Sequence, residues 1–311
     1  MEEQDAVCFG VKPSGMDVYS EQRTKADAVD DLMSFYTTAT HGTAGAEEGA
    51  DWRNIVFSYT GTESLSDRTF TSEGVYWPFS DPHLHVYASN MQMDAFSVSG
   101  MTVTTLNANN DLICAYDPYV DIETSYKVKR NLVFKHPYAR VSGVTVTSKQ
   151  GAGYDISNVD IWIENVKTGG VYNLRTGSED AAILSGAGWS SRTPSDETWS
   201  NADPLQAGTS IYSHAGVISS GNSDSNTNID LWLVPGDYWL RCSWRAAQDD
   251  YMQDFSCIRS ASAIHLSGGK MNVISVVLTG NGVEVSFGVT LAEWGSNLID
   301  DGFVPYDFPL E

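Results

Sequence analysis

Apolar and polar side chains alternate in short runs from one end of this chain to the other. Segments 7–12, 159–164 and 283–289 all follow this pattern of period two. Because successive side chains of a strand point to opposite faces, such runs predict strands with one buried face. Segment 271–278 is nearly all apolar and rich in β-branched residues, which predicts a central strand buried on both faces. Extended helical periodicity is hard to find, so the predicted class is all-β.

Turn residues separate these runs. In Leu231–Leu240 an aromatic strand pattern is interrupted by Pro235 and Gly236. Proline presets the φ angle of the first central residue of a type II turn, and glycine supplies the positive φ of the second. The segment is therefore predicted to form a β-hairpin.

The chain has 311 residues, enough for two ordinary domains. A polar, basic stretch at 124–130 precedes the apolar run 132–134 and marks the predicted boundary. We therefore predict two antiparallel β-sandwich domains in tandem, spanning residues 1–128 and 129–311. Two long loops are expected at 41–51 and 178–210, and ordered loops on a sandwich are common sites of recognition.

Charge restricts the partners. Forty acidic residues against 18 basic ones give a formal net charge of −22, which repels phosphate backbones, so nucleic acid is a poor partner. The acidic start, residues 1–5, is not a signal peptide, and no apolar run is long enough for a membrane helix. The rest of the sequence favours an extracellular protein. We therefore interpret the missing signal peptide as an export signal that has been removed.

Motifs for catalysis are absent: the sequence contains no GxSxG, no GxxxxGK[ST] and no HExxH. Paired carboxylates for glycoside hydrolysis remain possible among 40 acidic residues, but nothing singles out a pair. No catalytic residue, metal ligand or cofactor is therefore assigned, and the protein is predicted not to be an enzyme.

Two patterns resemble metal sites. His83 and His85 share one strand face, but the sequence identifies no third ligand, so a solvated strand face is favoured. The oxygen-rich segment 221–230 resembles a calcium loop, yet Ile229 stands in place of its glycine, so a plain polar loop is favoured. Cys242 and Cys257 are left open between a disulfide and buried thiols.

Tryptophans in the predicted loop at 178–210 are the candidate ligand-binding side chains. Trp189 and Trp199 lie there, and indole rings stack well on sugars. An extracellular carbohydrate-binding surface lipoprotein that does not polymerise is therefore one functional hypothesis.

Several segments, taken together in order, resemble the fimbrillin family of Bacteroidia-type (type V) pili. The most specific is Leu132–Val141, close to the family's pattern of Phe-x-His followed by Ala-x-Val. The other segments are Trp52–Tyr59, Tyr76–Pro78, Leu84–Ser89, Gly153–Val159 and Gly169–Asn173. The resemblance spans most of the chain.

This resemblance implies a structural or adhesive pilus subunit made of two transthyretin-like sandwiches. Such subunits are exported as outer-membrane lipoproteins and polymerise at the cell surface, with other pilus subunits as partners and possible ligands on host or bacterial surfaces. The resemblance further implies that a trypsin-like protease removes the first strand and that a strand from another subunit fills the groove left behind.

At the N-terminal end, three residues match this scheme. Val7, Phe9 and Val11 are expected to face inward on the exchanged first strand. Burial stabilises each such side chain by roughly 1.5–3 kcal/mol, and its departure leaves a groove that needs a replacement. Arg23, in the polar segment 21–25, is the candidate cleavage site; an ordinary loop arginine is the equally weighted alternative.

At the C-terminal end, a candidate donor tail alternates again. Its inward-facing residues are Val304, Tyr306, Phe308 and Leu310. Pro305 and Pro309 share the other parity, so the missing N–H groups fall on one side of the strand. We expect the tail to pair along one edge, which argues against pairing on both sides in a deep groove.

Overall fold

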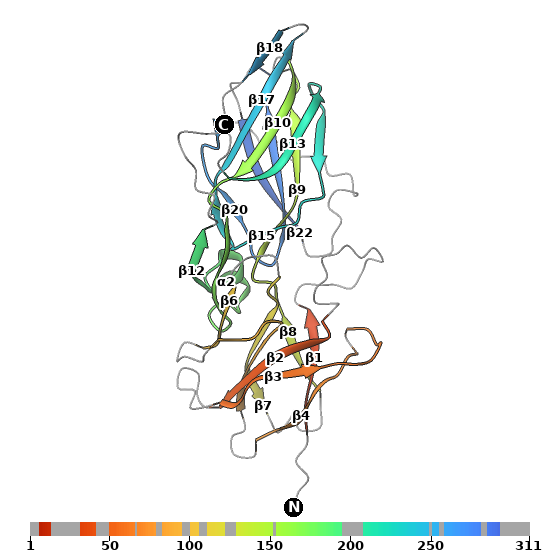
Figure 1. Cartoon of the computed structure of the whole chain (residues 1–311), viewed down its shortest axis with the longest axis vertical. Coiled ribbons are helices and arrows are strands. Elements are labelled where there is room, and N and C mark those ends of the chain that lie inside the picture. The colour runs from red at the N-terminus through yellow and green to blue at the C-terminus, as the bar shows by residue number, and fades with distance from the viewer. Residues whose placement is uncertain are drawn as a thin grey trace, which may run out of the picture. The chain divides into compact units, whose positions relative to one another are not determined.

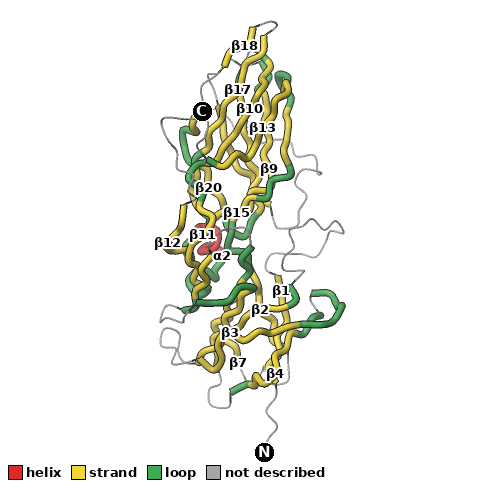
Figure 2. The backbone as a smooth tube through the Cα atoms, in the orientation of Figure 1, coloured by secondary structure: helices red, strands yellow, loops and turns green. Residues whose placement is uncertain are grey.

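Strands make up almost all of the regular secondary structure of the described chain, which confirms the all-β class (Figure 2). The computed structural model describes residues 6–13, 32–41, 50–65, 67–78, 83–94, 100–105, 111–121, 129–151, 154–194, 208–248, 251–254, 258–280 and 285–292. Within these residues the helix is α2 (Asp180–Ser185). The predictions for Arg23, Trp199, Cys257 and the tail residues Val304, Tyr306, Phe308 and Leu310 lie outside the described residues.

Backbone contacts group the chain into two compact units. The first consists of Met1–Tyr138 with Gly169–Arg192, and the second of Ala139–Thr168 with Thr193–Glu311. The sequence-based boundary between residues 128 and 129 stays a prediction, and so does the transthyretin-like character of the two domains.

The first unit is built on a seven-stranded sheet (Figure 1). In sheet order its strands are β7 (Cys114–Asp121), β5 (His83–Ser89), β2 (Ser34–His41), β3 (Ala50–Ser58), β4 (Phe70–Tyr76), β1 (Ala6–Pro13) and β8 (Arg130–Phe134). Neighbouring strands pair antiparallel except β1 and β8, which run parallel.

The two edge strands of this sheet meet each other. Cys114 N–H donates to the Lys135 carbonyl at 3.0 Å, and Lys135 N–H donates back to the Cys114 carbonyl at 2.8 Å. Nearby, the Arg130 guanidinium binds the Asp117 carboxylate at 2.7 Å. The sheet therefore curls round a single apolar core, to which its strands contribute side chains that are less than a tenth exposed.

A smaller sheet of three strands accompanies α2. Its order is β12 (Trp189–Pro194), β11 (Lys167–Asn173) and β6 (Thr102–Thr105). The helix ends at Gly186, whose left-handed φ of 72° lets its N–H bond back to the carbonyls of Ala182 and Ile183. The predicted loop at 178–210 therefore contains a helix and a strand.

Two larger sheets and one short one form the second unit. One has the order β13 (Thr209–Ile218), β10 (Asp155–Ile163), β17 (Leu240–Gln248) and β18 (Tyr251–Asp254), with β19 (Ile258–Arg259) also beside β17. The other has the order β14 (Ser223–Asn226), β9 (Ala139–Ser148), β21 (Met271–Leu278) and β22 (Val285–Ala292), with β15 (Leu231–Leu233) also beside β9. The short sheet pairs β16 (Gly236–Tyr238) with β20 (Ile264–Leu266).

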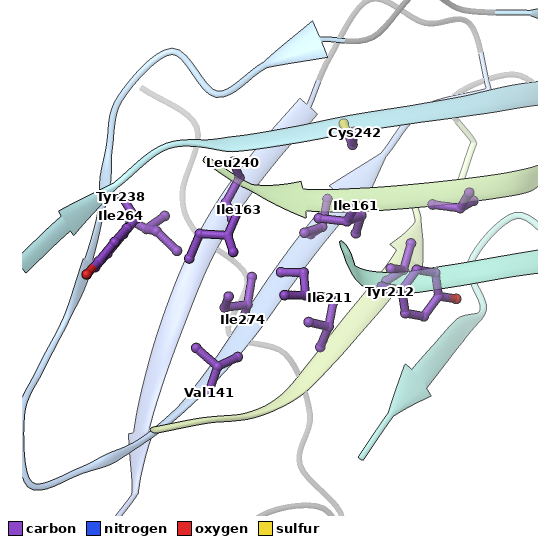
Figure 3. Packing of buried hydrophobic residues seen from close by; sticks show 14 of the residues in the cluster. Val141, Ile161, Ile163, Ile211, Tyr212, Tyr238, Leu240, Cys242, Ile264 and Ile274 are labelled. Atoms are coloured by element: carbon purple, nitrogen blue, oxygen red, sulfur yellow. The ribbon is translucent and has the colours of Figure 1, made fainter. Parts of the chain in front are cut away.

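Side chains from both larger sheets interdigitate in one core (Figure 3). Ile161 and Ile163 of β10 lie on one side, and Ile274 of β21 lies on the other; all three are fully buried. The predicted strand at 159–163 is confirmed as part of β10. The predicted central strand 271–278 is also confirmed, because β21 pairs with β9 on one side and β22 on the other.

The predicted hairpin at 231–240 is wrong. β15 pairs with β9, whereas β16 pairs with β20, so the strands on either side of Pro235 do not pair with each other. Val234 N–H donates to the Lys167 carbonyl at 2.7 Å, which draws the chain away from a turn. Gly236 has a φ of 150°, far from the value of about 80° that a type II turn needs.

Tyr238 stabilises the backbone between β15 and β16. Its buried hydroxyl donates to the Val234 carbonyl at 2.6 Å. We expect Tyr238→Phe to lower the free energy of unfolding by about 1 kcal/mol, because it leaves that carbonyl without its donor while keeping the ring. Urea denaturation checks this, with Tyr154→Phe as the control, since Tyr154 is 41% exposed. Equal losses in both variants would contradict the assigned role.

Candidate functional site

The first strand is an interior strand of its sheet. β1 pairs antiparallel with β4 through Ala6, Cys8 and Phe9, with an irregularity between Ala6 and Cys8. On its other side it pairs parallel with β8, from Phe9 opposite Arg130 to Pro13 opposite Phe134. Because β4 and β8 pair through β1 and not with each other, β1 fills a slot between them. We call this space the β1 slot.

The inward side chains of β1 are those expected from the alternation. Val7 and Phe9 are 0% exposed and Val11 is 2% exposed, all within the core of the first unit. The Phe9 ring meets Phe57 edge to face at 5.0 Å between centroids, and Trp77 at 6.1 Å. Such contacts between aromatic rings add to the stabilisation that comes from area burial.

The outward face of β1 at Gly10 is covered by side chains of β8 and of Lys129, the residue before it. A Cβ atom built on Gly10 would lie 2.1 Å from Asn131 Oδ1 and 3.1 Å from the Lys129 side chain. Lys129 is itself held in place, because its ammonium donates to the Arg68 carbonyl at 3.2 Å. Glycine therefore lets these side chains lie over the strand, although both are flexible enough to move aside.

Cys8 also lies on the outward face and is partly buried. Burial raises the pKa of its thiol, an effect that the nearby Lys129 ammonium partly offsets. The thiolate is the form that attacks thiol reagents, so Cys8 is expected to react slowly while β1 is in place.

The lining of the β1 slot is aromatic and aliphatic. Phe70 of β4 lies opposite Phe9, and Leu132 and Phe134 of β8 lie opposite Val11 and Pro13. All three lining residues are at most 1% exposed. Loss of β1 would open this lining to water and expose two unpaired strand edges.

The sequence did not identify β4 and β8 as the walls of the slot. The apolar run 132–134 belongs to β8, the strand that pairs with β1 in parallel. The alternation of apolar and polar residues shows where a strand lies but not which other strand it pairs with. It therefore does not link residues 6–13 to residues 130–134. Parallel pairing in particular needs a long crossover.

Trp189, a predicted ligand-binding residue, lies in β12 and is 6% exposed. Its indole N–H donates to the Pro137 carbonyl at 3.3 Å. The ring packs on Tyr138 and Tyr172, with centroid separations of 4.7 and 5.1 Å. The side chain supports the fold at this position, and its role in ligand binding, like that of Trp199, stays a prediction.

The histidine pair differs from the solvated face that the sequence favoured. His85 is 5% exposed, and its Nδ1 lies 3.0 Å from the Tyr116 hydroxyl on β7. The ring of His83 packs against that of Tyr119 in a tilted arrangement, with 4.1 Å between the ring centroids. His85 is buried because β7 pairs alongside β5 and its tyrosines cover the face. In the part of the chain that the structure describes, no three His, Cys, Asp or Glu side chains are grouped to hold a metal ion.

The oxygen-rich segment 221–230 is only partly a loop, because Ser223–Asn226 form β14 beside β9. Asp224 accepts a hydrogen bond from the Tyr212 hydroxyl at 2.6 Å. Asp230 accepts from the Arg140 guanidinium at 2.9 Å and from the Trp232 indole at 3.0 Å. These carboxylates therefore bind protein donors.

One carboxylate is deeply buried in the second unit. Glu164 is 2% exposed, and its two oxygens accept from the Nε atoms of Arg241 and Arg259. Arg241 is 5% exposed, whereas the Arg259 side chain is 45% exposed and stacks over the Trp239 ring at 4.1 Å. The arrangement is a buried network of ion pairs.

Among the described residues, no helix has the length and apolar character needed to span a bilayer.

Comparisons with known proteins agree with the fold. The family model described as Fimbrillin-like matches residues 18–294. A fimbrial protein from Bacteroides vulgatus ATCC 8482 is 13% identical, with 92% of this chain and 99% of that chain covered at a TM-score of 0.54. A presumed cell adhesion protein from Parabacteroides distasonis ATCC 8503 is 10% identical, with 94% and 98% covered at a TM-score of 0.55. No curated protein matches. At these identities the two structures indicate a shared fold alone.

Proposed function

Because this chain belongs to the fimbrillin-like family, we propose that it is a structural or adhesive subunit of a bacterial cell-surface pilus, joined to its neighbours by exchange of β1. The observation that carries this proposal is the position of β1. It is the first described strand, yet it lies in the interior of the sheet, between β4 and β8. A single cut in the chain that follows it would free the strand and leave the rest of the sheet covalently intact.

Exchange needs no catalysis by the subunit. A trypsin-like protease cuts after Arg23, the strand bearing Val7, Phe9 and Val11 departs, and a strand from another subunit enters the β1 slot. The driving force is burial of apolar side chains together with backbone pairing along both walls. The incoming strand runs parallel to β8 and antiparallel to β4, as β1 does.

Other parts of the proposal rest on family membership. The subunit is placed at the outer surface of the cell, after export as a lipoprotein, with two tandem transthyretin-like domains. Its partners are other pilus subunits, and host or bacterial surface ligands where it acts as an adhesin. The tail residues Val304, Tyr306, Phe308 and Leu310 are the candidate donor strand that the chain offers to a partner.

An arginine-specific, trypsin-like protease tests the cleavage step. We expect one early cut, after Arg23, and we expect the cut chain to take up a labelled peptide of residues 5–13. The uncut chain should take up little peptide at micromolar concentration, because a tethered strand has an effective concentration of the order of millimolar. Mass spectrometry locates the cut, and fluorescence anisotropy measures the uptake.

Two variants control this test. Arg23→Ala should resist the early cut and remain closed to the peptide, whereas Lys25→Ala, two residues away, should behave as the parent chain does. A cut chain that retains its own β1 and takes up no peptide would count against strand exchange, even if cleavage occurs at Arg23.

A further inference from the structure

The outward face of the sheet that contains β10 and β17 carries a row of large polar and aromatic side chains. Trp162 of β10 lies opposite Arg241 of β17, and Arg241 lies opposite Arg259 of β19. Directly opposed residues of neighbouring antiparallel strands share one face of a sheet. Because Ile161 and Ile163 point into the core (Figure 3), the row faces away from it.

The Arg259 guanidinium, at one end of this row, is held from two directions. Its Nε–H donates to the Glu164 carboxylate at 2.8 Å, and its central carbon lies 4.1 Å from the centroid of the Trp239 ring. Glu164 is 2% exposed and also accepts from Arg241, so its own position is fixed. A guanidinium that is already oriented loses little conformational freedom when it binds a further group.

Arg259 and Trp239 both have donors that the fold does not use. The Arg259 side chain is 45% exposed, and Trp239 is partly exposed. A guanidinium carries five N–H groups, and Glu164 takes only the one on Nε. Among the described residues, no acceptor is bonded to the terminal nitrogens of Arg259 or to the Trp239 indole N–H. These donors can therefore serve an acceptor on another molecule.

The local charge favours an anion. The Glu164 carboxylate is shared between the guanidiniums of Arg241 and Arg259, so one negative charge meets two positive charges. Asp237, two residues before Trp239, pairs with His265 instead. The whole chain carries a net charge of −22, but at physiological ionic strength exposed charges more than about 8 Å away are largely screened.

The shape of the site favours a carboxylate that is attached to a sugar ring. The two terminal nitrogens of a guanidinium match the two oxygens of a carboxylate. Trp239 adds an aromatic ring and an N–H donor beside them, which suits the C–H face and hydroxyl groups of a sugar. Trp162, also partly exposed, lies two strand spacings from Arg259, roughly 10 Å. A second linked sugar can meet it there.

We infer that this site binds an acidic glycan, with the carboxylate of a uronic or sialic acid on the terminal nitrogens of Arg259 and its ring beside Trp239. The inference deepens the proposed function, because it names the class of surface ligand for an adhesive subunit. It does not depend on strand exchange, since every residue of the site belongs to the second unit.

Nuclear magnetic resonance on the full chain tests the inference. The chain has nine tryptophans, so isotope-labelled tryptophan gives nine indole N–H signals, and the one missing from Trp239→Phe belongs to Trp239. The acidic probes are methyl glucuronide and methyl sialoside. Methyl glucoside is the neutral counterpart, and acetate is a carboxylate without a sugar ring.

We expect at least one acidic sugar to shift the Trp239 signal saturably, with a dissociation constant of about 1 mM, as is typical of a ligand of this size. Methyl glucoside and acetate should bind about 10-fold more weakly or less. The neutral sugar lacks the group that pairs with Arg259, and acetate lacks the ring that lies beside Trp239.

Two variants separate ligand binding from structural support. Arg259→Lys keeps the charge but loses the planar fork, so binding of the acidic sugar should weaken by about 10-fold. Trp232→Phe is the matched control and should bind as the parent chain does. Trp232 also lies beside an arginine, Arg140 at 5.6 Å, but its indole N–H already donates to Asp230.

A second measurement covers the case in which Arg259→Lys does not fold. Trp239→Phe keeps an aromatic ring but removes the indole N–H donor. Saturation transfer from the protein to the acidic sugar should then be weaker than with the parent chain, and unchanged with Trp232→Phe. Equal transfer in all three chains would contradict the assigned site.

The outcomes also separate this inference from the proposed pilus function. If neither acidic sugar shifts the Trp239 signal, or if Arg259→Lys binds as tightly as the parent chain, the inference is overturned and strand exchange is unaffected. If acetate binds as tightly as the acidic sugars, the site recognises a bare carboxylate and the glycan assignment is overturned. Failure of the cut chain to take up the β1 peptide would remove strand exchange and leave this site unaffected.

Discussion

A Phe9→Ala chain should lose about 3–5 kcal/mol of stability in its first unit, the range typical of a large aromatic side chain removed from a core. Phe9 is fully buried and touches the rings of Phe57 and Trp77, so the shortened side chain leaves a cavity that these rings can fill only in part. Since a whole domain is stable by only about 5–15 kcal/mol, the loss is a large fraction of the total. Hydrogen exchange read by mass spectrometry on β4 and β8 measures it.

The same substitution bears on function as well as on stability. A weaker hold on β1 should raise the reaction rate of the Cys8 thiol, whose pKa is kept high by burial. The matched control is Gly10→Ser, an outward change on the same strand, where only the flexible Asn131 and Lys129 side chains need to move. A Phe9→Ala chain with unchanged exchange in β4 and β8 would remove the basis for treating β1 as part of the core.

Glu164→Ala should destabilise the second unit by about 3–5 kcal/mol, because it removes the carboxylate that pairs with the buried charge of Arg241. Arg241 is 5% exposed, so water cannot easily replace the lost carboxylate. The double variant Glu164→Leu with Arg241→Met should recover most of the loss, since an apolar pair of similar volume often replaces a buried ion pair at little cost. Urea denaturation followed by fluorescence compares the variants.

Asp237→Ala is the control in the same unit. Asp237 also pairs with a basic side chain, His265 at 2.8 Å, but both side chains are largely exposed at 72% and 47%. Exposed ion pairs are worth about 0–1 kcal/mol, so this variant should be close to the parent chain. If Glu164→Ala were no more harmful than Asp237→Ala, the buried network would have no stabilising role.

Local patterning predicted where strands form, because the period of two follows from the geometry of a single strand. Residues 7–11, 159–163 and 271–278 are strands with the expected buried faces. The family resemblance, carried above all by Leu132–Val141, was confirmed by the match over residues 18–294.

The choice of strand partner was not predictable in the same way. Pro235 and Gly236 carried a strong local hairpin signal, yet β15 and β16 pair with β9 and β20 instead. Tertiary contacts decided this, in particular the bond from Val234 N–H to the Lys167 carbonyl. For the candidate site the alternation gave Val7, Phe9 and Val11, but the identity of the two walls required the fold.

The parallel pairing of β1 with β8 also fixes an order of events as the chain is made. Residues 6–13 leave the ribosome before the other described strands, but half of their backbone partners lie in residues 130–134, which emerge much later. Until then β1 lacks one of its two neighbouring strands, since long-range contacts form only after the intervening chain is available. The earliest of the described strands to be synthesised is thus among the last to be fully paired, so the first unit has an incomplete sheet until residues 130–134 are available.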